Sequence, residues 1–513
     1  MSSSGRMITS VIVIVFVIIG VGFVFGFILM NQTPTTTSTI TSTSMTGTTP
    51  TGTTTTSVPS TSWPTSTTFT NTTPTTTTPA RTLTIMTRFD VSVQSIFGPA
   101  FLASDFAISH HITDIIWKSP AVDFWDDLIL AGQTDLCWGG GEILFNQLVD
   151  DGYLIPLVGP EIDDIINRVN QNAMGTLLLH YDNEDLMWIG SSISSFGFTL
   201  NQEFLDTYSL STPLNWTDLR NVSYGSFLPA FATIAMANAP NSMSNLQIYQ
   251  IILQSQGWNE GWDLLSRMAG NSRIYGGSVE TQMACENGDV GVSMSIDFYG
   301  YLSQLNNPDC QYIIPSDGAY LESQPLAIVN TSSNADLAMG FIDFVMSPQG
   351  QSLFLDNSIR HLPAMVEAFQ EPLGLAAPDM YLAYNETVEK VNLDFNNTLA
   401  EEMQMSVAYY FESVLTNAHD ELVNCWSALI DAYLGMDINK SEFEYFVQLM
   451  SEPVSIIDPH TTQDETFDLQ YAISINNDLI YDDTYRGQVM TSWTNAAKLQ
   501  YNEVYQLLQD YIS

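Results

Sequence analysis

Apolar residues fill positions 8–30 without a charged residue among them, and this run is the first pattern in the chain. As a helix the run would be roughly 34 Å long, enough to cross the hydrocarbon core of a bilayer. Arg6 precedes the run and no basic residue follows it until Arg81, so the positive-inside rule places the amino terminus in the cytoplasm. A cleaved signal peptide, whose apolar core is usually shorter, is the alternative. We expect a single-pass transmembrane anchor over residues 1–30, with the bulk of the chain extracellular at the cell membrane.

Thr, Ser and Pro dominate residues 31–81, which therefore cannot bury a core. This composition is typical of an extended, O-glycosylated stalk. N-glycosylation sequons support an extracellular glycoprotein. They include those at Asn71, Asn215, Asn221, Asn330, Asn385, Asn396 and Asn439.

Short apolar runs alternate with helical patterns after residue 81, which predicts parallel α/β construction. The predicted strands span residues 83–87, 112–117 and 133–138, and the predicted helices run to about 110, around 125–130 and over 142–149. Ligands of such sheets bind at the carboxyl ends of the strands. Arg88 and the run Gly139, Gly140, Gly141 follow two of these ends.

A long β-rich stretch at 187–200 suits a segment that crosses from one lobe to another. Beyond it the patterns predict further strands at 222–227, 290–296, 311–315 and 325–329. Helices are predicted through residues 249–253, to 268, over 278–287, and at 336–346 and 347–354. The remaining 366–513 is mostly helical, with Trp426 between two helical stretches, a strand or helix at 471–480 and an amphipathic helix at 496–511. We expect this extension to pack on the lobes or to present a surface to a partner.

Charge and cysteine content exclude several classes. With 13 Lys and Arg against 56 Asp and Glu, the net charge is −43, so the chain would repel nucleic acid. Cys285 and Cys310 could pair, whereas Cys137 lies in an apolar strand and is expected in the core. No Cys/His spacing indicates a metal site, and no nucleophile, zinc-protease or phosphate-loop motif indicates an enzyme or a cofactor.

Five segments, in order along the chain, resemble substrate-binding proteins of ABC importers. They are TDLCWGGGEILFNQL at 134–148, GWNEGWDLL at 257–265, RIYGGS at 273–278, ENGDVGVSMSIDFYG at 286–300 and AMGFIDFVMSPQGQ at 338–351. The branch that they resemble most is the family-1-like group of ferric-iron, phosphonate and thiamine binders. The resemblance implies a two-lobed periplasmic-binding-protein-like (type II) α/β fold with a hinge over residues 82–365, its second lobe at about 200–315, and an ABC permease as partner. The Thr-rich stalk and the absence of a lipid-accepting cysteine indicate an archaeal type.

Candidate ligand contacts come from both lobes. The amides of Gly139, Gly140 and Gly141 precede a helix, where the dipole favours an anion. Hydroxyls at helix starts add three further candidates, Ser242, Ser244 and Ser278. Arg88, Trp138, Asp297 and Tyr299 complete the set.

Each candidate has a plainer explanation. The serines are also ordinary helix caps, and the glycines also suit a tight turn. Arg88 could pair with Asp90 or Asp114, and Trp138 could be a core residue.

The same residues bear on the ligand. Ferric-binding relatives place adjacent tyrosines near 297–299, and Phe298 lacks the phenolic oxygen, so a small anion is favoured and ferric ion is the alternative. A cell-surface structural or sensory ectodomain without a transport role is the alternative function.

Overall fold

The computed structural model describes residues 79–171 and 174–513, and residues 80–513 form one compact unit. The predicted anchor and nearly all of the predicted stalk lie outside the described residues. Within the described part, no helix is both long and apolar enough to cross a membrane.

The first lobe is built on a sheet in which β1, β2 and β3 run parallel. Its strands are β1 (Arg81–Thr87), β2 (Ile112–Lys118), β3 (Leu136–Trp138), β4 (Leu179–Asp182), β10 (Leu321–Ile328) and β11 (Leu362–Pro363). Its helices are α1 (Val91–Leu102), α2 (Asp105–Ser109), α3 (Trp125–Leu130), α4 (Glu142–Asp150), α5 (Pro160–Val169), α12 (Ala335–Met346) and α13 (Pro348–Leu353). The predicted alternation of strands and helices is confirmed here. The single helix predicted to about residue 110 is two helices, because the Ser104 hydroxyl accepts a hydrogen bond from the amide of Ala107 and begins a new one.

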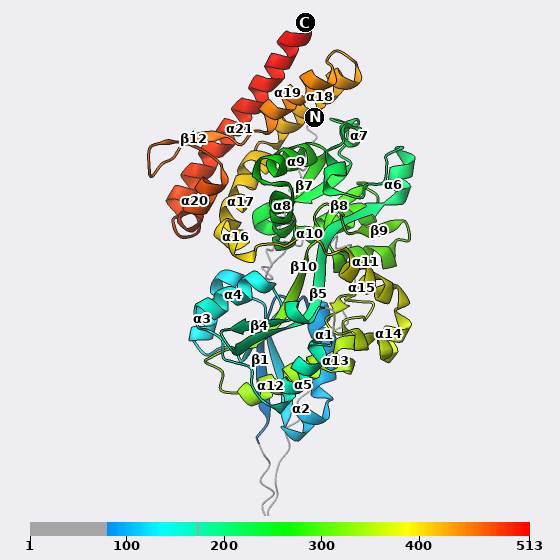
Figure 1. The fold of residues 1–513 in the computed structure, drawn as a ribbon, viewed down its shortest axis with the longest axis vertical. Coiled ribbons are helices and arrows are strands. Elements are labelled where there is room, and N and C mark those ends of the chain that lie inside the picture. The colour runs from blue at the N-terminus through cyan, green and yellow to red at the C-terminus, as the bar shows by residue number, and fades with distance from the viewer. Residues whose placement is uncertain (1–78, 172–173) are drawn as a thin grey trace, which may run out of the picture. The chain divides into compact units, whose positions relative to one another are not determined.

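Strand β5 (Asp185–Asn201) crosses between the two lobes, as its sequence predicts. Its first part pairs antiparallel with β10 up to Ser195, and from Phe196 onward it pairs with β8 (Val292–Ile296) of the second lobe. The strand order is therefore continuous, β2-β1-β3-β10-β5-β8-β6-β7. Figure 1 shows β5 and β10 running between the two lobes.

The second lobe repeats the α/β plan. Beside β8 it contains β6 (Ile234–Ala237), β7 (Ser272–Tyr275) and β9 (Cys310–Ile313). Its helices are α6 (Gln202–Thr207), α7 (Val222–Gly225), α8 (Met243–Gln256), α9 (Trp258–Gly270), α10 (Ser278–Glu286) and α11 (Asp297–Asn306). The carboxyl ends of β6 and β8 lead to the starts of α8 and α11, where candidate ligand contacts were predicted.

The C-terminal extension is helical, as predicted, apart from one hairpin. It consists of α14 (Pro372–Ala376), α15 (Pro378–Lys390), α16 (Asn397–Glu402), α17 (Gln404–Phe411), α18 (His419–Leu434), α19 (Lys440–Ser451), the pair β12 (Ser455–Ile457) and β13 (Asp464–Thr466), α20 (Leu469–Tyr481) and α21 (Asp483–Ile512). The α14–α15 part packs on the first lobe's core, whereas α17–α21 share one apolar core with the second lobe. Trp426, fully buried, lies inside α18 and not between two helices.

One further prediction needs correction, and one question that the sequence leaves open, the pairing of Cys285 with Cys310, is answered. Residues 222–227 are not a strand but begin with α7, because Asn221 caps the amide of Ser223 and Tyr224 turns into the core. Cys285 and Cys310 are both buried free thiols, and Cys285 donates to the carbonyl of Thr199 at 3.3 Å.

Candidate ligand-binding site

The loops that leave β1 and β3 are fastened to each other. The Thr87 hydroxyl donates to the carbonyl of Trp138 at 2.8 Å, and the amide of Arg88 donates to the same oxygen at 3.3 Å. Parallel neighbours end at the same sheet edge. Arg88 therefore lies beside the glycine run that follows Trp138.

The three glycines adopt φ values that other residues rarely take, 70° at Gly139, 115° at Gly140 and 86° at Gly141. They also leave no room for a side chain. A Cβ on Gly140 would lie 2.7 Å from Cγ of Arg88, and one on Gly141 would lie 2.1 Å from Oε1 of Glu322. The run therefore makes a tight turn that brings Arg88 and Glu322 against the backbone.

The amides around the start of α4 are already occupied. Gly139 donates to the carbonyl of Pro325 at 2.8 Å, and Gly140 donates to Oε1 of Gln324 at 3.0 Å. The amide of Glu142 donates to Oε1 of Glu322 at 3.1 Å. The amides of Gly139, Gly140 and Glu142 therefore bond to strand β10, and anion binding by the glycine run stays a prediction.

A half-buried Glu142 and a buried Glu322 form a carboxyl pair at this helix start. One oxygen of Glu142 accepts from the amide and the hydroxyl of Ser323, both at 3.0 Å. Burial and, to a smaller extent, the neighbouring charge of Glu142 together raise the pKa of Glu322 to about 8, although the hydrogen bond from the Glu142 amide lowers it. Burial also raises the pKa of Glu142, while its hydrogen bonds lower it. At neutral pH Glu322 therefore holds a proton and can sit beside Glu142 without charge repulsion.

Arg88 is half-buried and carries the positive charge of this region. Among the described residues its guanidinium donates one hydrogen bond, from Nη1 to the carbonyl of Pro120 at 3.4 Å. Neither Asp90 nor Asp114 forms an ion pair with it in the described chain, so the predicted surface pairing is wrong. Burial lowers the pKa of Arg88, which is the effect of an incompletely compensated buried charge.

The three candidate serines meet in the second lobe. The Ser278 hydroxyl lies 2.5 Å from that of Ser242 and 2.8 Å from that of Ser244. Ser242 also caps α8 by accepting from the amide of Asn245. Both explanations of Ser242 are therefore compatible with the structure, and direct ligand contact stays a prediction.

Asp297 and Trp138 are fully buried and are bonded within the protein. Asp297 accepts from the amide of Ser195 at 2.8 Å, and the indole N–H of Trp138 donates to the Ser191 hydroxyl at 2.8 Å. Both partners lie on β5, so these side chains support the crossing strand. Direct contact of either side chain with a ligand stays a prediction.

Tyr299 is half-buried and faces the first lobe. Burial raises its pKa to about 12, and the charge of Asp90 on the first lobe contributes. The phenol is therefore protonated at neutral pH. In the described part of the chain, no group of three His, Cys, Asp or Glu side chains could hold a metal ion.

An aromatic stack joins the lobes beside these residues, and sequence reasoning missed it. The ring of His361 lies 4.1 Å from that of Phe298 in the second lobe and 5.3 Å from that of Phe89 in the first. Burial lowers the pKa of His361 to about 4, so the ring is neutral at pH 7. Glu322 was missed as well, although a lone acidic residue inside an apolar strand is a signal that could have found it.

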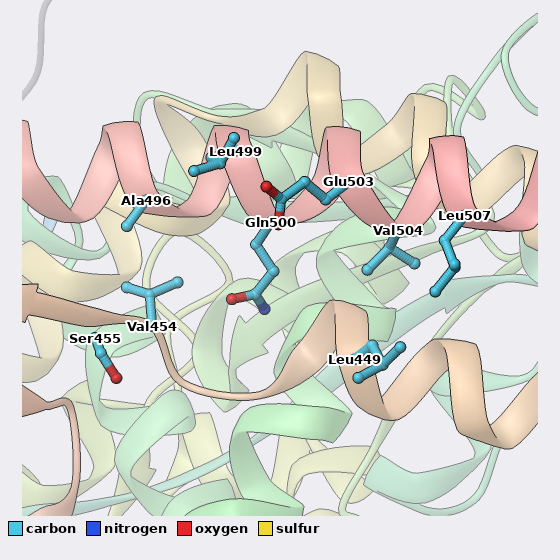
Figure 2. Close-up of a pocket in the computed structure, with 9 residues that line it drawn as sticks. All are labelled: Leu449, Val454, Ser455, Ala496, Leu499, Gln500, Glu503, Val504 and Leu507. Atoms are coloured by element: carbon cyan, nitrogen blue, oxygen red, sulfur yellow. The ribbon is translucent and has the colours of Figure 1, made fainter.

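A separate groove lies in the extension, away from every predicted site residue. It has a volume of about 510 Å³ and lies between α19 and α21 (Figure 2). The Gln500 amide on its wall donates to the carbonyls of Met450 and Glu452, both at 2.9 Å. Its lining is otherwise largely apolar.

Comparison with known proteins agrees with the fold. Residues 135–390 match the family described as bacterial extracellular solute-binding proteins. A solved structure of the GacH receptor of Streptomyces glaucescens is 14% identical, with a TM-score of 0.53, and the match covers 64% of this chain and 93% of that one. The predicted two-lobed fold is confirmed.

Two curated relatives are similar in sequence. The phosphoglycerate transport regulatory protein PgtC of Salmonella typhimurium is 26% identical over 288 residues, which is 55% of this chain and 66% of that protein, just under two thirds. An uncharacterized protein of Haemophilus influenzae is 24% identical over 225 residues, covering 43% of this chain and 60% of that protein. The family match and the fold together support an extracellular solute-binding protein.

Proposed function

We propose that this protein captures a small phosphorylated or carboxylated anion between its two lobes and delivers it to the permease of an ABC importer. The two-lobed fold and the family match over residues 135–390 support capture between lobes. Hinge closure around a solute is the usual motion of such a fold.

The environment of Arg88 is the observation that favours an anion as the ligand. In a chain with 56 acidic residues and 13 basic ones, a half-buried arginine without an acidic partner in the described chain is unexpected. Other arginines are paired, such as Arg81 with Asp336 at 2.6 Å and Arg267 with Glu444 at 2.8 Å. A guanidinium matches the planar oxygens of carboxylate and the oxygens of phosphate. We assign Arg88 the anionic group of the solute, with Gly140 beside it and Ser244, Ser278 and Tyr299 on the facing lobe.

The membrane attachment belongs to the same proposal. A single-pass anchor at residues 1–30 and a glycosylated stalk at 31–81 would hold the solute-binding domain, residues 82–365, and the extension, residues 366–513, at an archaeal cell surface. A tether of this kind raises the effective concentration of the receptor at its permease.

Binding of 3-phosphoglycerate to the purified full chain tests the proposal, since the name of the Salmonella relative refers to phosphoglycerate. We expect the compound to raise the unfolding temperature, and Arg88→Gln to weaken binding by roughly a hundredfold, since a buried charged hydrogen-bond partner is lost. Arg273→Gln is the matched control, because that exposed guanidinium lies over the Tyr275 ring. An equal loss of affinity in both variants contradicts an anion site at Arg88. So does a rise in unfolding temperature with ferric citrate but with none of the phosphorylated or carboxylated compounds.

A sensory role is the second candidate, because the name of the same relative describes a regulatory protein. Deleting the gene and measuring uptake of radiolabelled 3-phosphoglycerate separates the two. Loss of uptake with unchanged permease abundance supports delivery. Unchanged uptake by cells that still contain the permease supports sensing.

A further inference from the structure

Helix α16 of the extension is fastened to the second lobe. The side chain of Gln250 on α8 donates to the carbonyl of Ala400 at 2.6 Å. Gln254, one turn further, donates to the carbonyl of Asn396 at 3.1 Å and accepts from its amide at 2.8 Å. Leu399 packs against the second lobe's core. The helix therefore moves with that lobe.

The opposite side of α16 contacts α4 of the first lobe, and Figure 1 shows α16 between α4 and the second lobe. Asn397 donates from Nδ2 to Oε2 of Glu142 at 2.9 Å. Glu401 also faces the side chain of Gln147 across the same boundary, where burial raises the pKa of the Glu401 carboxyl group overall and the Gln147 side chain lowers it. Asn397 and Glu142 are 255 positions apart in the sequence.

Asn397 also reaches the hinge strand. Its Oδ1 accepts from the hydroxyl of Tyr320, just before β10, at 3.2 Å. Glu142, which it contacts, directly follows the glycine run and is bonded through its other oxygen to Ser323 of β10. A single asparagine thus joins the extension, the hinge and the helix that follows the candidate site.

We propose that α16 is a brace that fixes α4 relative to the second lobe, and that Asn397 is the positioning residue through which the extension sets how far the lobes open. The affinity consequence rests on the proposed function, whereas the lobe spacing does not. Glu142 is half-buried beside Glu322, and Asn397 donates a hydrogen bond to its Oε2 that solvent would otherwise have to replace. Moving the lobes apart would break this bond, and the brace therefore favours the lobe arrangement of the described structure.

Spin-label distances in the full chain test the brace without a ligand. Labels at Leu130→Cys on the first lobe and Met283→Cys on the second replace residues that are 62% and 55% exposed, while the native cysteines of the described chain are buried. We expect Asn397→Leu to lengthen and broaden the distribution of interlobe distances. Asn502→Leu, at an exposed position of α21 whose side chain bonds to Lys498 of the same helix, is the matched control and should leave the distribution unchanged. Glu401→Ala gives a second, milder disruption if Asn397→Leu fails to fold.

An unchanged distribution in Asn397→Leu and Glu401→Ala overturns the brace. Titration with 3-phosphoglycerate then separates the brace from the proposed function. We expect Asn397→Leu to bind it roughly tenfold more weakly, the factor that one hydrogen bond to a charged group represents. If the interlobe distance lengthens but the affinity equals that of the parent, the brace does not influence binding. If the interlobe distance lengthens in Asn397→Leu but the parent binds no anion at all, the brace is supported and the proposed function is contradicted.

Discussion

The carboxylate of Asp297 accepts a hydrogen bond of 2.8 Å from the backbone amide of Ser195, and this bond lies where the chain passes from one lobe to the other. Ser195 is the last residue of β5 to pair with β10, and Phe196 begins the pairing with β8. Asp297 is also the first residue of α11. A second-lobe helix is therefore tied to the crossing strand by a fully buried acid. Burial raises the pKa of Asp297 to about 7, although hydrogen bonds from Ser195 and Phe298 act in the opposite direction.

The stability of the protein should fall as the pH rises from about 4 to about 7. An aspartate in the unfolded chain ionises near 3.9, so in this interval the folded state keeps a proton that the unfolded state has lost. The slope reaches at most about 1.4 kcal/mol per pH unit for one such group. We expect Asp297→Asn to reduce the slope in urea unfolding at pH 4.5, 5.5 and 6.5. Asp309→Asn, at an exposed site, is the control, and an equally steep slope in Asp297→Asn contradicts the assignment.

Asp458 should stabilise the extension in the opposite pH sense. It accepts from the hydroxyls of Tyr471 at 2.6 Å and Tyr485 at 2.5 Å. Burial raises its pKa, but the tyrosine and Thr461 bonds outweigh burial and bring the pKa to about 2. The pKa of an aspartate in the unfolded chain is near 3.9. The contribution of Asp458 to the free energy of unfolding is therefore fully present above that pH and is lost as the pH falls through about 2.

Tyr485→Phe removes one of these bonds without changing the ring. We expect a loss of about 1.5–3 kcal/mol in the free energy of unfolding at pH 7, since the bond is to a charged group. Tyr481→Phe, at a residue that is 84% exposed, is the control. The difference between Tyr485→Phe and the parent should shrink below pH 3, and a difference that is constant down to pH 2 would show that Asp458 is not the partner that matters.

The packing of the extension on the second lobe depends on the absence of a side chain at Gly270. A Cβ there would lie 2.6 Å from Cδ1 of Trp426, whose indole N–H donates to Oδ1 of Asn271 at 2.7 Å. We expect Gly270→Ala to cost about 1–3 kcal/mol through overpacking and to expose α18 to limited proteolysis. Gly487→Ala, inside α21, meets nothing within 4 Å and should not destabilise the protein. Equal stability of the two variants contradicts this packing account.

The sequence predicts best what local pattern determines. The crossing strand was found because 185–201 is long, rich in apolar and small residues and free of proline. Residues 222–227 were misassigned because Val222, Tyr224 and Phe227 have strand propensity, while the Asn221 cap and burial of Tyr224 decide the helix. Strand β6 was missed because its four residues are too few to show a period.

Contacts between distant residues account for the rest. The bond between the amide of Glu142 and Glu322 joins positions 180 apart, and no local pattern connects them. Arg88 could be placed near the glycine run because both follow strand ends in one sheet. Asp297 also follows a strand end, but its neighbours turn it toward β5, which strand position alone does not determine.

The carboxyl group of Glu322 should make anion binding at Arg88 depend on pH above neutrality. Because its pKa is about 8, the carboxyl group is neutral at pH 7 and mostly ionised at pH 9. It lies against Gly141, and Arg88 packs against the preceding residue, Gly140. A new negative charge near the solute disfavours an anion, by about 1 kcal/mol or more at short range in a partly buried site. We therefore expect the parent to bind 3-phosphoglycerate several-fold more weakly at pH 9 than at pH 7.5, an interval in which the compound itself no longer titrates. Glu322→Gln keeps the shape and removes the titration, so its affinity, measured by calorimetry at both pH values, should stay nearly constant. An equal pH effect in Glu322→Gln would assign the dependence to another group.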